Sequence, residues 1–155
     1  MAVNTENMED LQNLYDCGFN KLMGVRIVEV AKDHAEAELT IGPEHLQPHG
    51  FLHGGATLAL LEVAASAATC ANADLETQLP FGVGIHVRHR KAGVSGVIKA
   101  VARLNHQEIS SYSGALKQTW DVAAYDEAGD VISEGTFDSK IVSREYYASK
   151  QAAQR

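Results

Sequence analysis

The chain of 155 residues is poor in cysteine and proline, with two and three copies respectively. Cys17 and Cys70 lie far apart in the sequence and form no C-x-x-C pair. This usage excludes the disulfide framework of a small secreted protein. We expect both thiols to be free, in a reducing compartment.

Long apolar runs are also absent. No stretch approaches the roughly 20 apolar residues that a membrane-spanning helix requires. The first segment, MAVNTENMEDLQNLYDCGFN, is acidic and has neither the basic region nor the apolar core of a secretory signal. With 45% hydrophobic and 21% charged residues, the composition is that of a soluble globular protein. We therefore expect one domain, 1–155, in the cytoplasm, with no membrane partner.

Positive charge is scarce, because 13 lysines and arginines face 20 acidic residues and the formal net charge is -7. Nucleic acid is therefore not expected as a partner, since phosphate binding needs a concentrated basic surface. One exception is HVRHRKAGVSGVIK, 86–99, which contains no acid. This basic strip has two interpretations: a site for an anionic small ligand, or a solvated strand edge with protective charges.

Apolar periodicity predicts an α+β protein: an N-terminal helix, a hairpin, a long buried helix and about four antiparallel strands. Asn7 is the expected N-cap of the first helix, and Gly24 ends it. A polar connection, 106–115, separates two of the later strands, and the tail from Ser143 is polar and at most helix-prone. In chain order the predicted segments are 7–22, 24–31, 34–42, 54–73, 81–91, 94–105, 116–126 and 130–142.

The long helix begins near Gly54 and consists mainly of alanine and other apolar residues. A helix that is apolar all round is normally buried all round, and small side chains let a sheet curl closely around it. Its single acid, Glu62, therefore needs an explanation. A buried carboxylate costs several kcal/mol unless it is paired or hydrogen-bonded. Either Glu62 reaches the surface and meets a partner there, or it belongs to a site.

Two features near Glu62 favour a site. Ser66 lies at i+4 from Glu62, on the same helix face. Upstream, His53-Gly54-Gly55 begins the helix, where free backbone N–H groups and the helix dipole can stabilise an oxyanion. Glycine at that position lets a substrate carbonyl approach closely. The carboxylate could act as a nucleophile or as a general base.

The run LQPHGFLHGGATLALLEVAAS resembles the signature of hotdog-fold acyl-CoA thioesterases. The resemblance is to the branch with 4-hydroxybenzoyl-CoA, 1,4-dihydroxy-2-naphthoyl-CoA and phenylacetyl-CoA (PaaI-like) types. It extends through FGVGIHVRHRKAGVSG and WDVAAYDEAGDVISEGTF and covers about 18–142, which leaves 143–155 as a tail. It implies a sheet wrapped around a central helix, and hydrolysis of an aryl or short to medium acyl-CoA.

The resemblance also implies residue roles. Glu62 would attack the thioester carbonyl or activate water, and Gly54, with Gly55, would donate N–H to the carbonyl oxygen. Gln47 and His53 would orient the thioester or the water, and Ser66 would hold the water or the acyl ring. The site would lie between two subunits of a homodimer or homotetramer. No cofactor is implied, because coenzyme A is part of the substrate.

The resemblance places the phosphates of coenzyme A near the basic strip. Strand alternation puts His89 and Lys91 on one face and Arg88 and Arg90 on the other, so His89 and Lys91 are the favoured ligands and the arginines the solvated alternative. Ser110 and Ser111 are further candidates, in a connection longer than the family's turn. Arg88 also replaces the asparagine usual before the strand histidine.

Other functions compete with hydrolysis as interpretations of the same residues. Two histidine pairs, His49 with His53 and His86 with His89, could ligate a metal, but no cysteine or carboxylate stands at ligand spacing, and no metal is expected. No G-x-S-x-G segment exists, which disfavours a serine hydrolase. An enoyl-thioester hydratase or dehydratase using Glu62, and a non-catalytic acyl-CoA-binding protein, remain alternatives.

Overall fold

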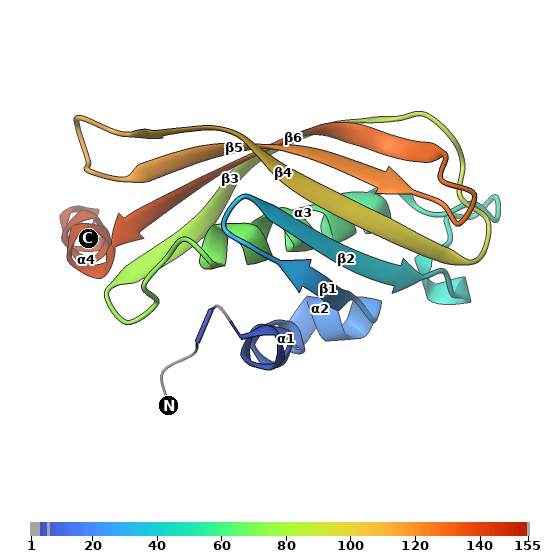
Figure 1. The fold of residues 1–155 in the computed structure, drawn as a ribbon, viewed down its shortest axis with the longest axis horizontal. Coiled ribbons are helices and arrows are strands. Elements are labelled where there is room, and N and C mark those ends of the chain that lie inside the picture. Colours follow the sequence, from blue (N-terminus) through green and yellow to red (C-terminus); the bar gives the residue numbers. More distant parts are fainter. Residues whose placement is uncertain (1–3, 6, 155) are drawn as a thin grey trace.

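The computed structural model describes residues 4, 5 and 7–154 (Figure 1). Within these residues six strands form one antiparallel sheet in the order β1-β2-β4-β5-β6-β3. The strands are β1 (Arg26–Val30), β2 (His34–Thr40), β3 (Gln78–His89), β4 (Val97–Ile109), β5 (Leu116–Tyr125) and β6 (Val131–Ser143). The helices are α1 (Met8–Tyr15), α2 (Gly18–Met23), the short 3-10 helix η1 (Pro43–His45), α3 (Gly54–Cys70) and α4 (Arg144–Ala153).

The sheet curves around α3, as Figure 1 shows, and the core lies between them. Alternation places Ala35, Ala37 and Leu39 of β2 against the helix, while their neighbours face outward. Ala64 and Ala68 of α3 are fully buried, and their small side chains allow this close wrapping. The predicted α+β architecture, with a sheet around a long helix, is confirmed.

The backbones of β3 and β6 approach each other closely at Gly135. A Cβ atom at Gly135 would lie 1.9 Å from the carbonyl oxygen of His86. That oxygen belongs to the backbone of the paired strand and cannot rotate away. Only glycine fits at this position, in the middle of the pairing that places β3 at the edge of the sheet.

The N-terminal helix differs from its prediction. Asn7 caps α1 as expected, with its side chain accepting from Glu9 N and Asp10 N, and Gly24 caps α2 in a left-handed conformation. The predicted segment 7–22 is nevertheless two helices. The chain leaves helical geometry at Asp16 and Cys17, so that α1 and α2 run in different directions, with α1 against β1 and α2 against α3.

Two other segments are more ordered than predicted. The polar segment 106–109 continues β4, because it pairs with Leu116–Thr119 of β5, so the connection is only 110–115. The polar character of this segment fits the exposure of successive residues at this end of β4. The tail after Ser143 forms α4, with the Ser143 hydroxyl accepting from Tyr146 N as an N-cap.

The sheet has two ends that matter for function. One end holds the start of α3, the exit of β3 and the β5–β6 turn (Figure 1). The other end holds the C-terminus of α3, the start of β3, the loop 110–115 and α4. Among the described residues no helix combines the length and the apolar character needed to cross a membrane.

Candidate active site

The first turn of α3 presents one backbone donor that is free. His53 is the N-cap, and its Nδ1 accepts from Gly55 N at 2.8 Å. The amides of Ala56 and Thr57 bond to the His53 carbonyl oxygen. The Gly54 amide has no acceptor among the described residues. Of the two glycines predicted as oxyanion donors, Gly54 is thus the available one, at the positive end of the helix dipole.

His89 lies directly over this helix start. Its Nδ1 is 2.8 Å from the Oγ of Ser133, a buried residue of β6. A Cβ atom at Gly54 would be 2.7 Å from His89 Nε2, which explains the glycine. Ser133, which the sequence did not single out, holds the imidazole in this position. The contact joins the end of β3 to the start of α3.

A cavity of about 390 Å³ opens at this end of the sheet. Gln47, Gly54, Thr57 and His89 line it. Gln47 Oε1 accepts from His49 N at 2.6 Å, so the Nε2 amide group is the part that can reach a ligand. The structure thus brings together three residues that the sequence predicted for the site: Gln47, Gly54 and His89.

Glu62 and Ser66 lie elsewhere on α3. Glu62 is eight residues after Gly54, a rise of ~12 Å along the helix. Its side chain is exposed in the single chain, next to Gly82 of β3, where an ideal Cβ would be 3.4 Å from Glu62 Oε1. Ser66 lines a small cavity of about 60 Å³. Within one chain, the carboxylate and the free amide therefore cannot act on the same carbonyl group.

A tyrosine hydroxyl and a cysteine thiol meet at the small cavity, a contact that was not predicted from the sequence. Tyr15 Oη lies 3.2 Å from Cys70 Sγ, and both residues line the cavity with Ser66. Burial raises the pKa of Tyr15 well above its usual range, and Cys70 acts in the same direction. Burial likewise raises the pKa of the Cys70 thiol. Both groups are neutral at physiological pH, and both cysteines are free thiols, as predicted.

Most of the basic strip is neutralised by acids. Lys91 lies at the 390 Å³ cavity, but its Nζ is 2.6 Å from Asp126 and 2.7 Å from Asp130. These hydrogen bonds raise the pKa of Lys91, and the bond from Lys91 lowers the pKa of Asp126. Arg90, which also lines the cavity because β3 ends before it, pairs with Glu134 at 2.9 Å. Lys91 therefore anchors the β5–β6 turn.

Arg88 and the two predicted serines lie outside this cavity. Arg88 is exposed on β3 and has no ion pair among the described residues. Ser110 and Ser111 begin the loop 110–115, at the opposite end of the sheet from Gly54. That loop contacts α4, where Lys150 Nζ lies 5.6 Å from the centre of the Tyr112 ring. The predicted substrate-binding residues thus fall into two groups within one chain.

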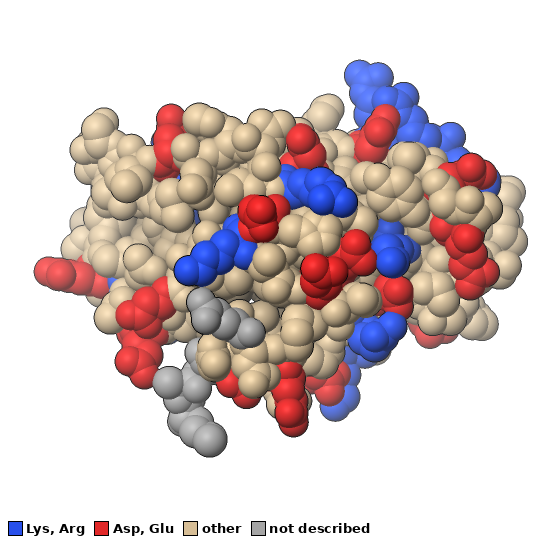
Figure 2. Space-filling model, viewed as in Figure 1, with Lys and Arg blue, Asp and Glu red and all other residues tan. Residues whose placement is uncertain are grey.

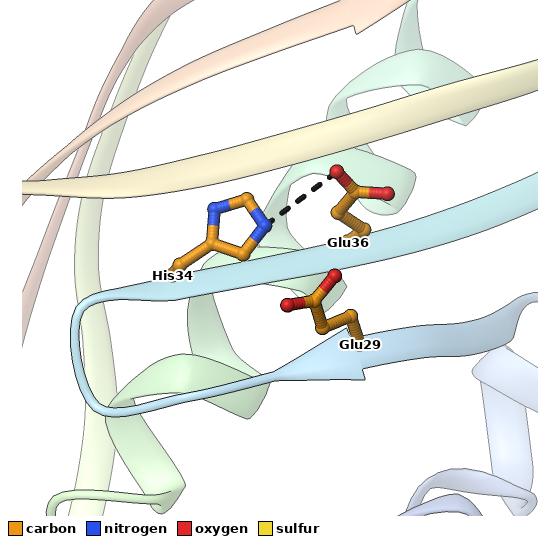
Figure 3. Close-up of side chains that lie close together, drawn as sticks. All are labelled: Glu29, His34 and Glu36. Atoms are coloured by element: carbon orange, nitrogen blue, oxygen red, sulfur yellow. Dashed lines mark ion pairs between the residues drawn. The ribbon is translucent and has the colours of Figure 1, made fainter.

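Neither histidine pair considered as a metal site gathers a third ligand among the described residues. The one group that does, within 4, 5 and 7–154, is Glu29, His34 and Glu36 on the outer face of the β1–β2 hairpin (Figure 3). His34 Nε2 is 3.5 Å from Glu36 Oε1, and Lys99 Nζ is 3.1 Å from Glu36 Oε2. The lysine already balances this carboxylate, and the group lies on the face of β2 that points away from α3.

The sheet wrapped around α3 and the free amide at the start of that helix define a class of protein, and comparisons with known proteins identify this class. Residues 18–141 match the family described as "Domain of unknown function (DUF4442)". The crystal structure of a thioesterase from Haemophilus influenzae, HI1161, superposes with a TM-score of 0.80 at 22% identity, covering 92% of this chain and 94% of that one. The chain belongs to the DUF4442 family and is a hotdog-fold thioesterase.

Curated relatives are similar over most of the chain. A 1,4-dihydroxy-2-naphthoyl-CoA hydrolase from Listeria monocytogenes is 30% identical over 115 residues, 74% of this chain and 88% of that protein. A relative from Deinococcus radiodurans is 35% identical over 111 residues, and the chain spans 65% of its length. The enzyme class predicted from the sequence, a thioester hydrolase, is thereby confirmed.

Proposed function

We propose that this protein hydrolyses acyl-CoA thioesters in a homodimer whose sites combine Glu62 of one chain with Gly54 and Gln47 of the other. The separation along α3 carries this proposal. An oxyanion donor must lie about 3 Å from the carbonyl oxygen, and the attacking carboxylate or water must reach the same carbonyl. A rise of ~12 Å between Gly54 and Glu62 excludes both tasks within one helix.

The free edge of β3 supports a dimer of this kind. β3 is an edge strand, and Val83 at its edge is 57% exposed. An unpaired edge is a template for a second strand. If two copies pair antiparallel along β3, the Gly82 end of one strand runs beside the His89 end of the other. Glu62, which lies against Gly82, then approaches the partner's helix start.

The chemistry follows from these positions. The thioester oxygen accepts from the Gly54 amide, and Gln47 positions the thioester or the water. Glu62 attacks the carbonyl carbon and forms an acyl anhydride, which water then cleaves to regenerate the carboxylate, or Glu62 removes a proton from a water molecule that attacks the carbonyl carbon directly. In both routes the C–S bond breaks, the thiolate of coenzyme A takes up a proton, and water supplies the oxygen of the free acid. These steps use the chain's own residues without a cofactor or a metal.

We infer an aryl or short to medium acyl group for the substrate. The Listeria relative is named for an aryl-CoA substrate. In this chain Ser66 and the cavity closed by Tyr15 and Cys70 lie one helical turn beyond Glu62, where an acyl group would extend. The exposed free thiol of Cys17 fits a cytoplasmic, reducing location. Assembly of dimers into a tetramer remains a prediction from the resemblance.

The replacement of Glu62 by glutamine tests the proposal. We expect Glu62→Gln to lower kcat for release of free thiol from benzoyl-CoA by about 10²–10⁴-fold, the usual contribution of a general base or nucleophile. Binding of the thioester should persist, because the amide keeps the shape of the side chain. Glu76→Gln, at an exposed acid outside the site, is the matched control.

Two outcomes would contradict the proposal. Equal turnover by the Glu62→Gln variant would remove the carboxylate from the mechanism. Absence of thiol release by the parent protein across aryl, short and long acyl-CoA thioesters would favour a non-catalytic acyl-CoA-binding protein.

A further inference from the structure

The small cavity beside Ser66 receives a side chain from the N-terminal helix. Tyr15 is the last residue of α1, and its hydroxyl lies 3.2 Å from the Sγ atom of Cys70, the last residue of α3. The family model matches 18–141, so α1 lies outside the part of the chain that this model describes. One wall of the cavity is therefore built by a segment to which the family match assigns no role.

Several contacts fix α1, and with it the ring of Tyr15. Leu11 is buried, and Gln12 Oε1 accepts from the backbone amide of Ile27 in β1 at 2.7 Å. The Tyr15 side chain packs against the core, and its hydroxyl has Cys70 as its partner. A buried hydroxyl without a partner would cost free energy, so this contact stabilises the observed orientation of the ring. The ring thus forms a fixed wall of the cavity.

The cavity extends from the neighbourhood of Glu62 toward Tyr15. Gly82, which lies against Glu62 Oε1, lines the cavity at one end. Cys70 also lines it, eight residues after Glu62 and thus ~12 Å further along α3. Glycine, serine and cysteine have small side chains and leave room between α3 and β3, whereas Tyr15 places an aromatic ring beside Cys70. The cavity therefore ends at Tyr15, on the side away from the carboxylate.

The size and lining of the cavity indicate which part of a thioester it can take. Its volume of about 60 Å³ holds roughly two water-sized groups. Charged side chains of both signs lie on the face of the molecule seen in Figure 2, whereas none of the described residues that line this cavity is charged. Burial raises the pKa of Tyr15 and of Cys70, so both groups are neutral. The long phosphate-bearing arm of coenzyme A fits neither the volume nor the lining, which leaves the acyl group.

We propose that Tyr15 limits how far the acyl group can extend beyond Glu62, so that the protein prefers short chains among straight-chain acyl-CoA thioesters. The acyl chain runs from the carbonyl group beside Glu62 along α3, and its end meets the Tyr15 ring and Cys70. A longer chain overpacks this end of the cavity, and the thioester is then displaced from the catalytic groups. This inference rests on the proposed function, because it assigns the acyl group to the site that contains Glu62.

Kinetics with straight-chain thioesters of coenzyme A, from acetyl to decanoyl, test the assignment. In the parent, kcat/KM should fall sharply once the chain outgrows the cavity, since one methylene group in a hydrophobic pocket is worth about 10–200-fold. Tyr15→Ala removes the ring and should raise the ratio of kcat/KM for octanoyl-CoA to that for butyryl-CoA by at least about tenfold. Tyr15→Phe keeps the ring and should keep the parent's ratio. Leu14→Ala, at an exposed neighbour on α1, is the matched control.

A second variant remains decisive if Tyr15→Ala does not fold. Cys70→Leu adds bulk at the same end of the cavity and should lower the ratio of kcat/KM for butyryl-CoA to that for acetyl-CoA by at least about tenfold. Parental ratios in both Tyr15→Ala and Cys70→Leu would overturn the assignment. A Tyr15→Phe variant that behaves like Tyr15→Ala would also overturn it, because the hydroxyl and not the ring would then decide the chain length.

Calorimetric titration in a Glu62→Gln background separates this inference from the proposed function. There, Tyr15→Ala should raise the affinity for octanoyl-CoA relative to butyryl-CoA by at least about tenfold. If the parent hydrolyses no thioester, the proposed function fails, while the titration still decides whether Tyr15 limits the acyl chain. Relative affinities that are the same with and without Tyr15→Ala would overturn the role of Tyr15, even if hydrolysis is confirmed.

Discussion

Two histidines contact the first residues of α3, and each of them contacts a different glycine. His53 uses Nδ1 to cap the Gly55 amide, which leaves the Gly54 amide as the free donor. His89, held by Ser133, covers the Cα of Gly54 and forms a wall of the cavity. The absence of a side chain at Gly54 therefore serves the packing of His89 as well as access to the amide.

A substitution at Gly54 should show this packing. Alanine is normally favoured over glycine in a helix by about 0.5–1 kcal/mol. In Gly54→Ala, however, the new Cβ would lie 2.7 Å from His89 Nε2, so the imidazole must move and give up its hydrogen bond to Ser133, and we expect a net loss of about 0.5–1.5 kcal/mol in place of the gain. Thermal or urea unfolding measures the change.

The control is the same substitution without the imidazole. In a His89→Ala background, Gly54→Ala should be neutral or stabilising, since the new methyl group meets no ring. An equal loss of stability in both backgrounds would show that contact with His89 is not the reason why residue 54 is glycine.

At the element scale, Lys91 connects the exit of β3 with the turn between β5 and β6. Its ammonium group lies between Asp126 and Asp130, and the Oδ1 atom of Asp126 also accepts from the amides of Ala128 and Asp130. The turn beside the cavity is thereby held by one cation. The lysine that the resemblance assigned to coenzyme A thus has a structural explanation.

The pH dependence of stability tests this connection. Because the folded-state pKa of Asp126 is lowered, its contribution is complete above the unfolded-state pKa of about 4 and is lost as the pH falls through the folded value. The raised pKa of Lys91 keeps the lysine charged throughout this range. The Lys91→Met variant should therefore have a lower Tm than the parent at pH 7, and this difference in Tm should shrink as the pH is lowered. A difference in Tm that stays constant from pH 7 to pH 2 would contradict an electrostatic role.

In the proposed dimer, each chain contributes one half of each of the two active sites. The oxyanion donor and Gln47 lie at the start of α3, and Glu62 lies ~12 Å further along the helix. A second copy joined along β3 would complete both sites.

Mixing two inactive variants tests this arrangement. Glu62→Gln and Gln47→Ala damage different halves, so a mixed dimer has one intact site and one doubly damaged site. After subunit exchange of equal amounts, half of the dimers are mixed, and about a quarter of the parent activity should return. Activity no higher than the average of the separate variants would show that each site lies within one chain. Size-exclusion chromatography with light scattering measures the oligomeric state, and capture of one variant through an affinity tag shows how much of the untagged variant has exchanged into mixed dimers.

Much of the fold could be predicted from the sequence, because it depends on periodicity and turn chemistry that are local. The hairpin, the four later strands and the alanine-rich helix all lie near their predicted bounds. The break between α1 and α2 could not be predicted, since helical spacing of apolar residues runs through it. The end of β4 was missed because pairing with β5, a non-local contact, orders a polar segment.

The chemical groups of the site follow from the residue types along the chain: a lone carboxylate on an apolar helix, a glycine at the helix start, and a histidine and a glutamine at fixed spacing. Which of these groups meet depends on how distant segments pack in the folded chain. Ion pairs between distant strands neutralise Lys91 and Arg90, and the packing of α4 gathers Lys140 and Lys150 in one cavity. The reason is physical: residue type sets what a group can do, whereas its charge balance and its neighbours depend on segments far away in the chain.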